Sequence, residues 1–192
     1  MAAGQDPELG LMVMRIISRQ WVPSAAVRLQ EQGPDYLAPV DDADWSEGVG
    51  FLRGFFSTFR IRAGRDVWFH FPLPTPVEQD GELLFLDSVS LLWEALDGAR
   101  IGWIVAQHGG CERLPLTERL AAPPAVPEPF APPEQWRQYY PVMDRQRTDI
   151  ALRPHLPLRF GVQLCVMVSA PADADGTVRF YGAGAAFASA GA

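Results

Sequence analysis

The stretch that decides the fold is Val67-Trp68-Phe69-His70-Phe71-Pro72-Leu73-Pro74-Thr75-Pro76-Val77. Side chains alternate between the two faces of a strand, so Phe69, Phe71 and Leu73 share one face and Trp68 and His70 share the other. We expect the phenylalanine face to be core and the Trp68 face to be the outer surface. Prolines at every second position remove N–H donors, which favours an edge strand or a stiff extended connector over a central strand.

Other segments of the chain show the same period of two. Phe59–Arg62 alternates and is followed by the turn Ala63–Asp66, so we expect it to form a hairpin with Val67–Phe71. Residues 82–93 are apolar on both faces, as in a central strand. Further strands are predicted at Arg100–Gln107, with Ile101, Trp103 and Val105 on one side, at Leu158–Ser169 and at Thr177–Phe187.

Short strands separated by turns such as Asp80-Gly81 and Asp173–Gly176 are typical of an antiparallel β-sandwich. The sequence therefore predicts an all-β, jelly-roll-like sandwich of about eight or nine strands, with a closed barrel as the alternative. Residues 1–40 are expected to be an N-terminal extension that packs on the sheet or pairs with it. Residues 41–192 form the sandwich domain, with a proline-rich insertion at 121–141 that includes a short helical turn near Glu134.

Residues 68–77 match the pattern Trp-Phe-His-x-Pro-x-Pro-Thr-Pro-Val, which resembles the signature of a family of small bacterial and fungal β-rich proteins of unknown function. Gly48-Val49-Gly50 with Arg53-Gly54, the apolar residues 83–92 and the ending Gly182–Phe187 extend the resemblance. The extension at 1–40 and the insertion at 121–141 depart from it. The resemblance implies a β-rich fold and carries over no activity or catalytic residue.

Composition excludes several functions. The 192 residues carry a net charge of −7, which argues against nucleic acid as a partner. All 16 basic residues are arginine, so lysine Schiff bases and the P-loop lysine are absent. We find neither a signal-peptide pattern nor a membrane-spanning apolar run, and so expect a cytoplasmic protein without a membrane partner. Cys111 and Cys165 are predicted to be free, buried thiols.

The candidate ligand or partner surface consists of aromatic side chains and one histidine, because such groups stack and still offer a polar tip. It comprises Trp68, His70, Trp136, Tyr139 and Tyr140. His70 could equally serve the fold by bonding a neighbouring backbone group. The dispersed histidines His70, His108 and His155 lack metal-ligand spacing, so no metal and no cofactor is predicted.

These features favour a binding or interaction module for a protein partner, for self-association or for a small apolar ligand. One alternative is a small cofactor-free enzyme of the cyclase or isomerase type, although the sequence leans away from an enzyme. Its acid–base candidates would be His70, Asp66, Asp87 and Glu94. A second alternative is a carbohydrate-binding domain, against which the lack of an export signal counts.

Overall fold

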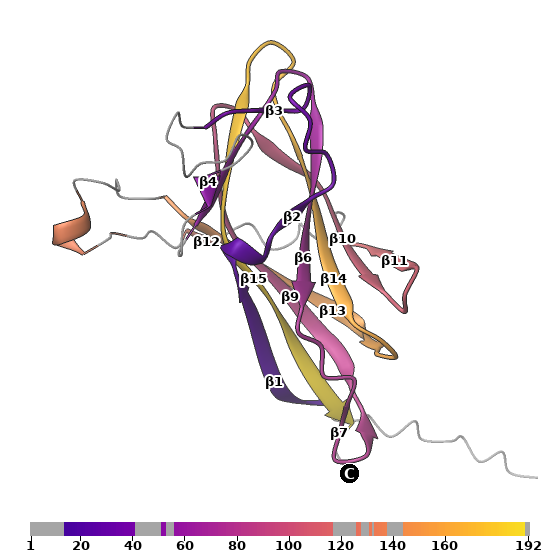
Figure 1. The fold of residues 1–192 in the computed structure, drawn as a ribbon. Coiled ribbons are helices and arrows are strands. Elements are labelled where there is room, and N and C mark those ends of the chain that lie inside the picture. The colour runs from indigo at the N-terminus through magenta and orange to yellow at the C-terminus, as the bar shows by residue number, and fades with distance from the viewer. Residues whose placement is uncertain are drawn as a thin grey trace, which may run out of the picture.

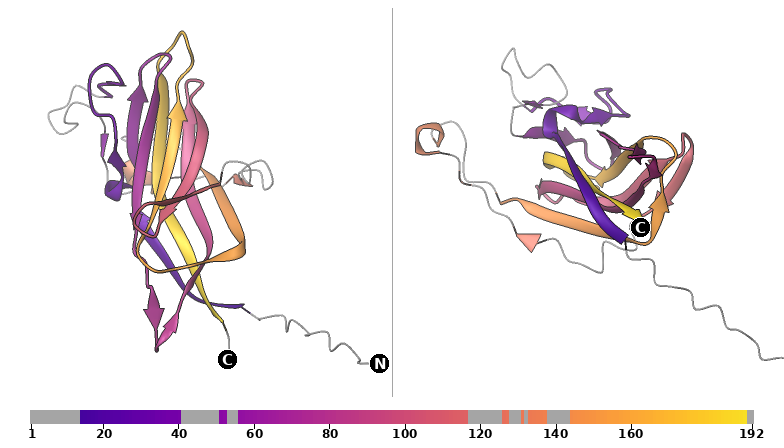
Figure 2. Two further views of the ribbon diagram at one scale, coloured as in Figure 1. Left: turned by 90° about the vertical axis from the view of Figure 1, so that its right-hand side faces the viewer. Right: turned by 90° about the horizontal axis from the view of Figure 1, so that it is seen from below.

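The computed structural model describes residues 14–40, 51–52, 56–116, 126–127, 131, 133–137 and 144–190. Within these residues two antiparallel sheets face each other, which confirms the predicted all-β sandwich. Figure 1 shows the sheets side by side, and Figure 2 shows them from two further directions. No helix in the described part of the chain has the length and apolar character needed to cross a membrane.

The larger sheet has eight strands and the smaller sheet has five, within the residues described. The eight-stranded sheet contains β1 (Met14–Pro23), β3 (Leu37–Ala38), β4 (Phe51–Leu52), β5 (Ser57–Ile61), β9 (Phe85–Leu96), β12 (Val126–Pro127), β13 (Gln146–Pro157) and β15 (Gly176–Ala190). The five-stranded sheet contains β2 (Arg28–Leu29), β6 (Asp66–Leu73), β10 (Arg100–His108), β11 (Glu112–Pro115) and β14 (Val162–Ser169). The prediction of eight or nine strands is too low, because two-residue strands such as β2 and β3 are too short to show a periodicity.

Three small elements complete the described structure. β7 (Glu78–Gln79) and β8 (Glu82–Leu83) form a separate hairpin at one end of the sandwich (Figure 1). The 3-10 turn η1 (Ser24–Ala26) follows β1 directly. The 3-10 turn η3 (Glu134–Trp136) lies beyond strand β12, away from the body of the sandwich (Figure 1).

Strand β15 organises the larger sheet. It pairs with β9 over most of its length, with β5 near its start and with β1 from Gly182 to Ala190. Residues 14–23 of the N-terminal segment therefore lie in the sheet as strand β1. A side chain at Gly184 would place its Cβ 2.7 Å from the Trp21 ring, so glycine lets β1 and its tryptophan lie close against β15.

The predicted hairpin between Phe59–Arg62 and Val67–Phe71 is wrong. β5 belongs to the eight-stranded sheet and β6 to the five-stranded sheet, so the turn between them crosses from one layer to the other. The Gly64 N–H donates to the Pro171 carbonyl at 2.6 Å, and the Ala170 N–H donates to the Arg65 carbonyl at 3.0 Å. The Arg65 N–H closes the turn by donating to the Arg62 carbonyl at 3.0 Å, but the turn is also bonded to the connection between β14 and β15.

The core lies between the sheets and is centred on phenylalanine. Phe69 of β6 contacts Phe59 of β5 and Phe180 of β15, with ring centroids 5.0 and 4.9 Å apart. Phe71 meets Phe180 edge-on at 5.2 Å. Val67, Phe69, Phe71 and Leu73 are all buried, so the inner face of β6 is the predicted one. Trp68 and His70 consequently lie on the outer face of the five-stranded sheet.

Candidate functional site

The outer face of the five-stranded sheet brings aromatic and polar side chains into register. Strand β14 lies between β10 and β6, so each outward residue of β14 has a partner on both sides. Three successive cross-strand rows result: Trp103–Met167–Trp68, Val105–Cys165–His70 and Gln107–Gln163–Pro72. Cross-strand neighbours have Cβ atoms about 5 Å apart, so each row is a contiguous strip of surface.

The first row is an aromatic surface. The Trp68 and Trp103 rings have centroids 6.4 Å apart and planes inclined at 32°, and Trp103 is 47% exposed. The prediction that Ile101 shares a face with Trp103 is wrong, because a bulge between them shifts the register of β10. Ile101 packs against the core, while Trp103 stands outward beside Trp68.

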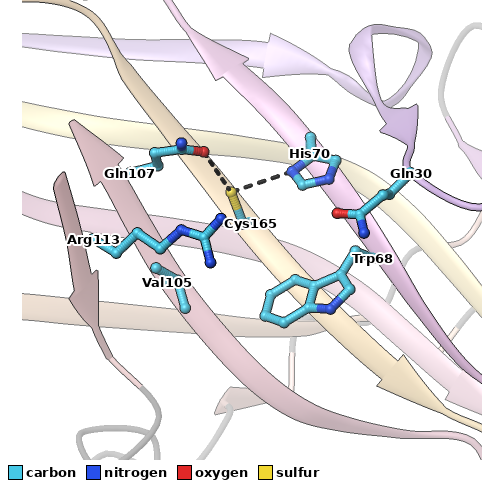
Figure 3. A pocket seen from close by; sticks show the side chains of 7 residues that line it. All are labelled: Gln30, Trp68, His70, Val105, Gln107, Arg113 and Cys165. Atoms are coloured by element: carbon cyan, nitrogen blue, oxygen red, sulfur yellow. Dashed lines mark hydrogen bonds between the residues drawn. The ribbon is translucent and has the colours of Figure 1, made fainter. Parts of the chain in front are cut away.

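Polar side chains form the next two rows. His70 Nδ1 lies 3.2 Å from Cys165 Sγ (Figure 3). It also lies 3.0 Å from Gln163 Nε2. Because an amide nitrogen only donates, the second contact makes Nδ1 an acceptor and places the imidazole proton on Nε2. Gln163 Nε2 also donates to Gln107 Oε1 at 3.4 Å. The Gln163 amide of β14 therefore links His70 of β6 to Gln107 of β10.

Burial keeps this cluster uncharged. Desolvation lowers the pKa of His70, an effect that the Glu31 carboxylate opposes and the Arg113 guanidinium reinforces. Desolvation raises the pKa of the Cys165 thiol, against the Gln163 hydrogen bond and the charge of Arg113. At neutral pH the pair is a thiol beside a neutral imidazole. A nucleophilic cysteine requires a thiolate, and this environment disfavours one.

The lowered pKa of His70 makes stability depend on pH. The unfolded chain takes up its proton near the ordinary value of about 6.5, while the folded protein takes it up only at lower pH. This contribution to the free energy of unfolding is therefore present above about pH 6.5 and is lost as the pH falls through the folded pKa. When the pH is lowered from 7.5 to 5.0, the urea midpoint should decrease less for His70→Gln than for the wild type. Equal decreases would contradict this role of His70.

Side chains on the outer face of the five-stranded sheet and in the segment after β2 line a cavity of about 160 Å³ that is open at the surface. Figure 3 shows its lining: Gln30, Trp68, His70, Val105, Gln107, Arg113 and Cys165. The segment after β2 closes one side, since the Gln30 N–H donates to the Trp68 carbonyl at 3.0 Å and the Trp68 N–H donates to the Glu31 carboxylate at 2.9 Å. Strand β6 is therefore not an edge strand at Phe69 and His70, where β2 pairs with it, and its prolines lie beyond that pairing.

The predicted aromatic surface is brought together only in part. Trp68 and His70 share the cavity, whereas Trp136 belongs to η3, which stands apart from β6 and β14 (Figures 1 and 2). Tyr139 and Tyr140 lie outside the described residues. Both cysteines are free and Cys165 is buried, as predicted. The predicted burial of Cys111 is wrong: Cys111 is exposed, because it follows the glycine turn between β10 and β11.

The predicted acid–base residues do not surround His70. Asp66 is exposed at the start of β6. Asp87 lies in the other sheet, where its Oδ1 is 3.0 Å from both His155 Nε2 and Arg153 Nη1. Glu94, also in the other sheet, accepts hydrogen bonds from Arg179 and Tyr181. In the part of the chain that the structure describes, no three His, Cys, Asp or Glu side chains are placed to hold a metal ion.

Comparison with protein-family models and with curated proteins finds no match for the chain. Among solved structures, the chain is similar to TmCBM61, whose structure was determined in complex with beta-1,4-galactotriose. The identity is 9%, the TM-score is 0.39, and the alignment covers 86% of each chain. A likeness this distant assigns no ligand. The strands and side chains of this protein define a β-sandwich with an aromatic and polar cavity on its five-stranded sheet.

Proposed function

We propose that this protein is a carbohydrate-binding β-sandwich that holds a neutral saccharide on the outer face of its five-stranded sheet. The observation that carries the proposal is that an aromatic row, Trp68 with Trp103, lies on the same sheet face as a row of amides, Gln107 with Gln163, with the His70–Cys165 row between them. A sugar ring has an apolar C–H face and a rim of hydroxyl groups. The tryptophan row is complementary to the C–H face, and the amide row is complementary to the hydroxyl groups.

The aromatic row supplies apolar contact at a small entropic cost, since a tryptophan ring is large and turns about only two bonds. The amides of Gln107 and Gln163 and the guanidinium of Arg113 provide planar donors, and the amides also provide acceptors. A few such polar groups around an apolar body fix the orientation of a small ligand. The lining thus suits a molecule that is apolar on one side and hydroxylated at its edge.

The charges on this face favour a neutral ligand. Arg113 and Glu31 bring opposite charges to the surroundings of His70, and both act on its pKa. The other polar lining groups are the amides of Gln30 and Gln107, the Cys165 thiol and the imidazole of His70, whose pKa is lowered by burial. The lining provides neither the clustered cations that a phosphate needs nor a matching set of anions for a cationic ligand.

Binding is a better account of this surface than catalysis. The cavity is small and lies open at the surface, whereas the enzyme alternative calls for an enclosed apolar pocket with a carboxylate beside the histidine. Asp87 and Glu94 lie in the opposite sheet, and the Cys165 thiol is protonated at neutral pH. The small apolar ligand considered from the sequence also fits less well, because amide and guanidinium groups line the cavity.

Replacing Trp103 by alanine should weaken saccharide binding about tenfold, because it removes one of the two indole rings on which the sugar stacks. Titration calorimetry with soluble β-1,4-linked gluco-, manno-, xylo- and galacto-oligosaccharides measures the change. The matched control is Trp21→Ala, because Trp21 is 43% exposed but belongs to the other sheet. Equal losses in both variants, or no binding of any of these sugars by the wild type, would contradict the proposal.

A further inference from the structure

A second cavity lies next to the first, with Gln107 in the lining of both. It has a volume of about 380 Å³ and shares the lining residues Gln107 and Gln163 with the network around His70. From this amide pair it extends to Pro72, His108 and Gly161. The two cavities therefore adjoin at Gln107, and together they are called the groove.

The groove is long in comparison with a single sugar ring. It begins at Trp68, which pairs with Met167, and reaches Gly161, six residues from Met167 along the chain. At about 3.3 Å per residue in extended chain this separation is roughly 20 Å. A monosaccharide on the tryptophans would leave the second cavity empty.

The far end of the groove is open. Gly110 and Gly161 both line it without a side chain, and a Cβ built at either position meets no atom within 4 Å. At the joint, the Gln163 amide donates to Gln107 at 3.4 Å, a long bond that ligand hydroxyls can replace. The groove thus has an aromatic start, a polar middle and an unobstructed end.

We infer that the ligand is a linear oligosaccharide, several linked rings long, that lies along the strands from the tryptophans to Gly161. This inference rests on the proposed function and adds the length and direction of the ligand. The first ring packs on Trp68 and Trp103, the following rings pass over the His70–Cys165 row to the amide pair, and later rings occupy the second cavity beside Pro72. The open end lets a longer chain pass out of the groove, so the interior of a polysaccharide is recognised as well as its terminus.

The test is the dependence of affinity on chain length, measured by titration calorimetry with one to six units of the best-binding β-1,4-linked sugar. The affinity of the wild type for four units should be at least about tenfold higher than for two units, with little further gain at six units. Gly161→Trp should abolish this gain and leave the affinity for two units unchanged. A Cβ built at Gly161 meets no atom within 4 Å, and Gly161 does not require a positive φ, so the variant is expected to fold.

The matched control is Gly33→Trp, because Gly33 also has no atom within 4 Å of a built Cβ and does not line either cavity. It should keep the full dependence on chain length. Equal affinity of the wild type for two and four units would overturn the inference while leaving the proposed function intact. An equal loss for both lengths in Gly161→Trp would also overturn it. Absence of binding at every length would reject the proposed function itself.

Discussion

Replacing Phe69 by alanine is expected to lower the free energy of unfolding by about 3–5 kcal/mol, the range for phenylalanine-to-alanine changes in a packed core. Phe69 is fully buried and contacts one ring from each of two strands in the opposite sheet, Phe59 and Phe180. Removing it opens a cavity where the two sheets meet. The rigid strands on either side limit how far the cavity can collapse.

Urea denaturation of the Phe69→Ala and Phe160→Ala variants measures this difference. Phe160 is the matched control, since it is 61% exposed and lies just before the first residue of β14. Its replacement should change the free energy of unfolding by less than about 0.5 kcal/mol, as at most surface positions. A loss at Phe69 as small as that at Phe160 would show that the phenylalanine cluster does not hold the sheets together.

The second large effect is expected at Glu94. Its side chain is 5% exposed, lies 3.1 Å from Arg179 and accepts hydrogen bonds from the Tyr181 hydroxyl at 3.0 Å and the Asp144 N–H at 3.2 Å. Desolvation and the adjacent Glu94 carboxylate together raise the pKa of Tyr181, so its hydroxyl stays a donor. Replacing Glu94 by leucine leaves the Arg179 charge without this partner in a largely buried place.

We expect Glu94→Leu to cost about 3 kcal/mol of unfolding free energy, the lower end for breaking a buried ion pair, because Arg179 is partly exposed. Arg62→Gln is the control: its pair with Asp175 spans 3.6 Å, with the two side chains 43% and 34% exposed, and should contribute no more than about 1 kcal/mol. The measurement is again the urea midpoint at constant pH. A Glu94→Leu variant as stable as Arg62→Gln would contradict this account of the cluster.

Alternation in the sequence is enough to predict the fold class and the two faces of β6. The inward face is apolar at every second residue from Val67 to Leu73, and no other arrangement buries it. The neighbours of β6 could not be predicted in the same way. The turn at Gly64 resembles a hairpin turn locally and has the local bond from the Arg65 N–H to the Arg62 carbonyl, yet it also bonds to residues 170–171, more than a hundred positions away. Pairing between distant segments leaves little trace in local sequence.

The site illustrates the same limit. Trp68 and His70 could be placed outward from their own strand, but Cys165, Gln163 and Gln107 come from β14 and β10 and join them only through register. Trp103 was harder still, because the bulge before it reverses the side that simple alternation assigns. A signal was present in the alternating polar positions Gln163 and Cys165 of β14. Without the order of the strands, it could not be connected to His70.

The most direct test of saccharide binding on the five-stranded sheet is to follow the indole N–H signals of the six tryptophans by NMR during titration with the best-binding oligosaccharide. Single Trp→Phe variants assign the signals. The signals of Trp68 and Trp103 should shift together with the ligand concentration. Those of Trp21, on the other sheet, and of Trp93, whose indole donates to Thr148 Oγ1 at 3.0 Å, should stay in place. Saturable shifts at Trp21 with none at Trp68 and Trp103 would contradict a binding site on the five-stranded sheet.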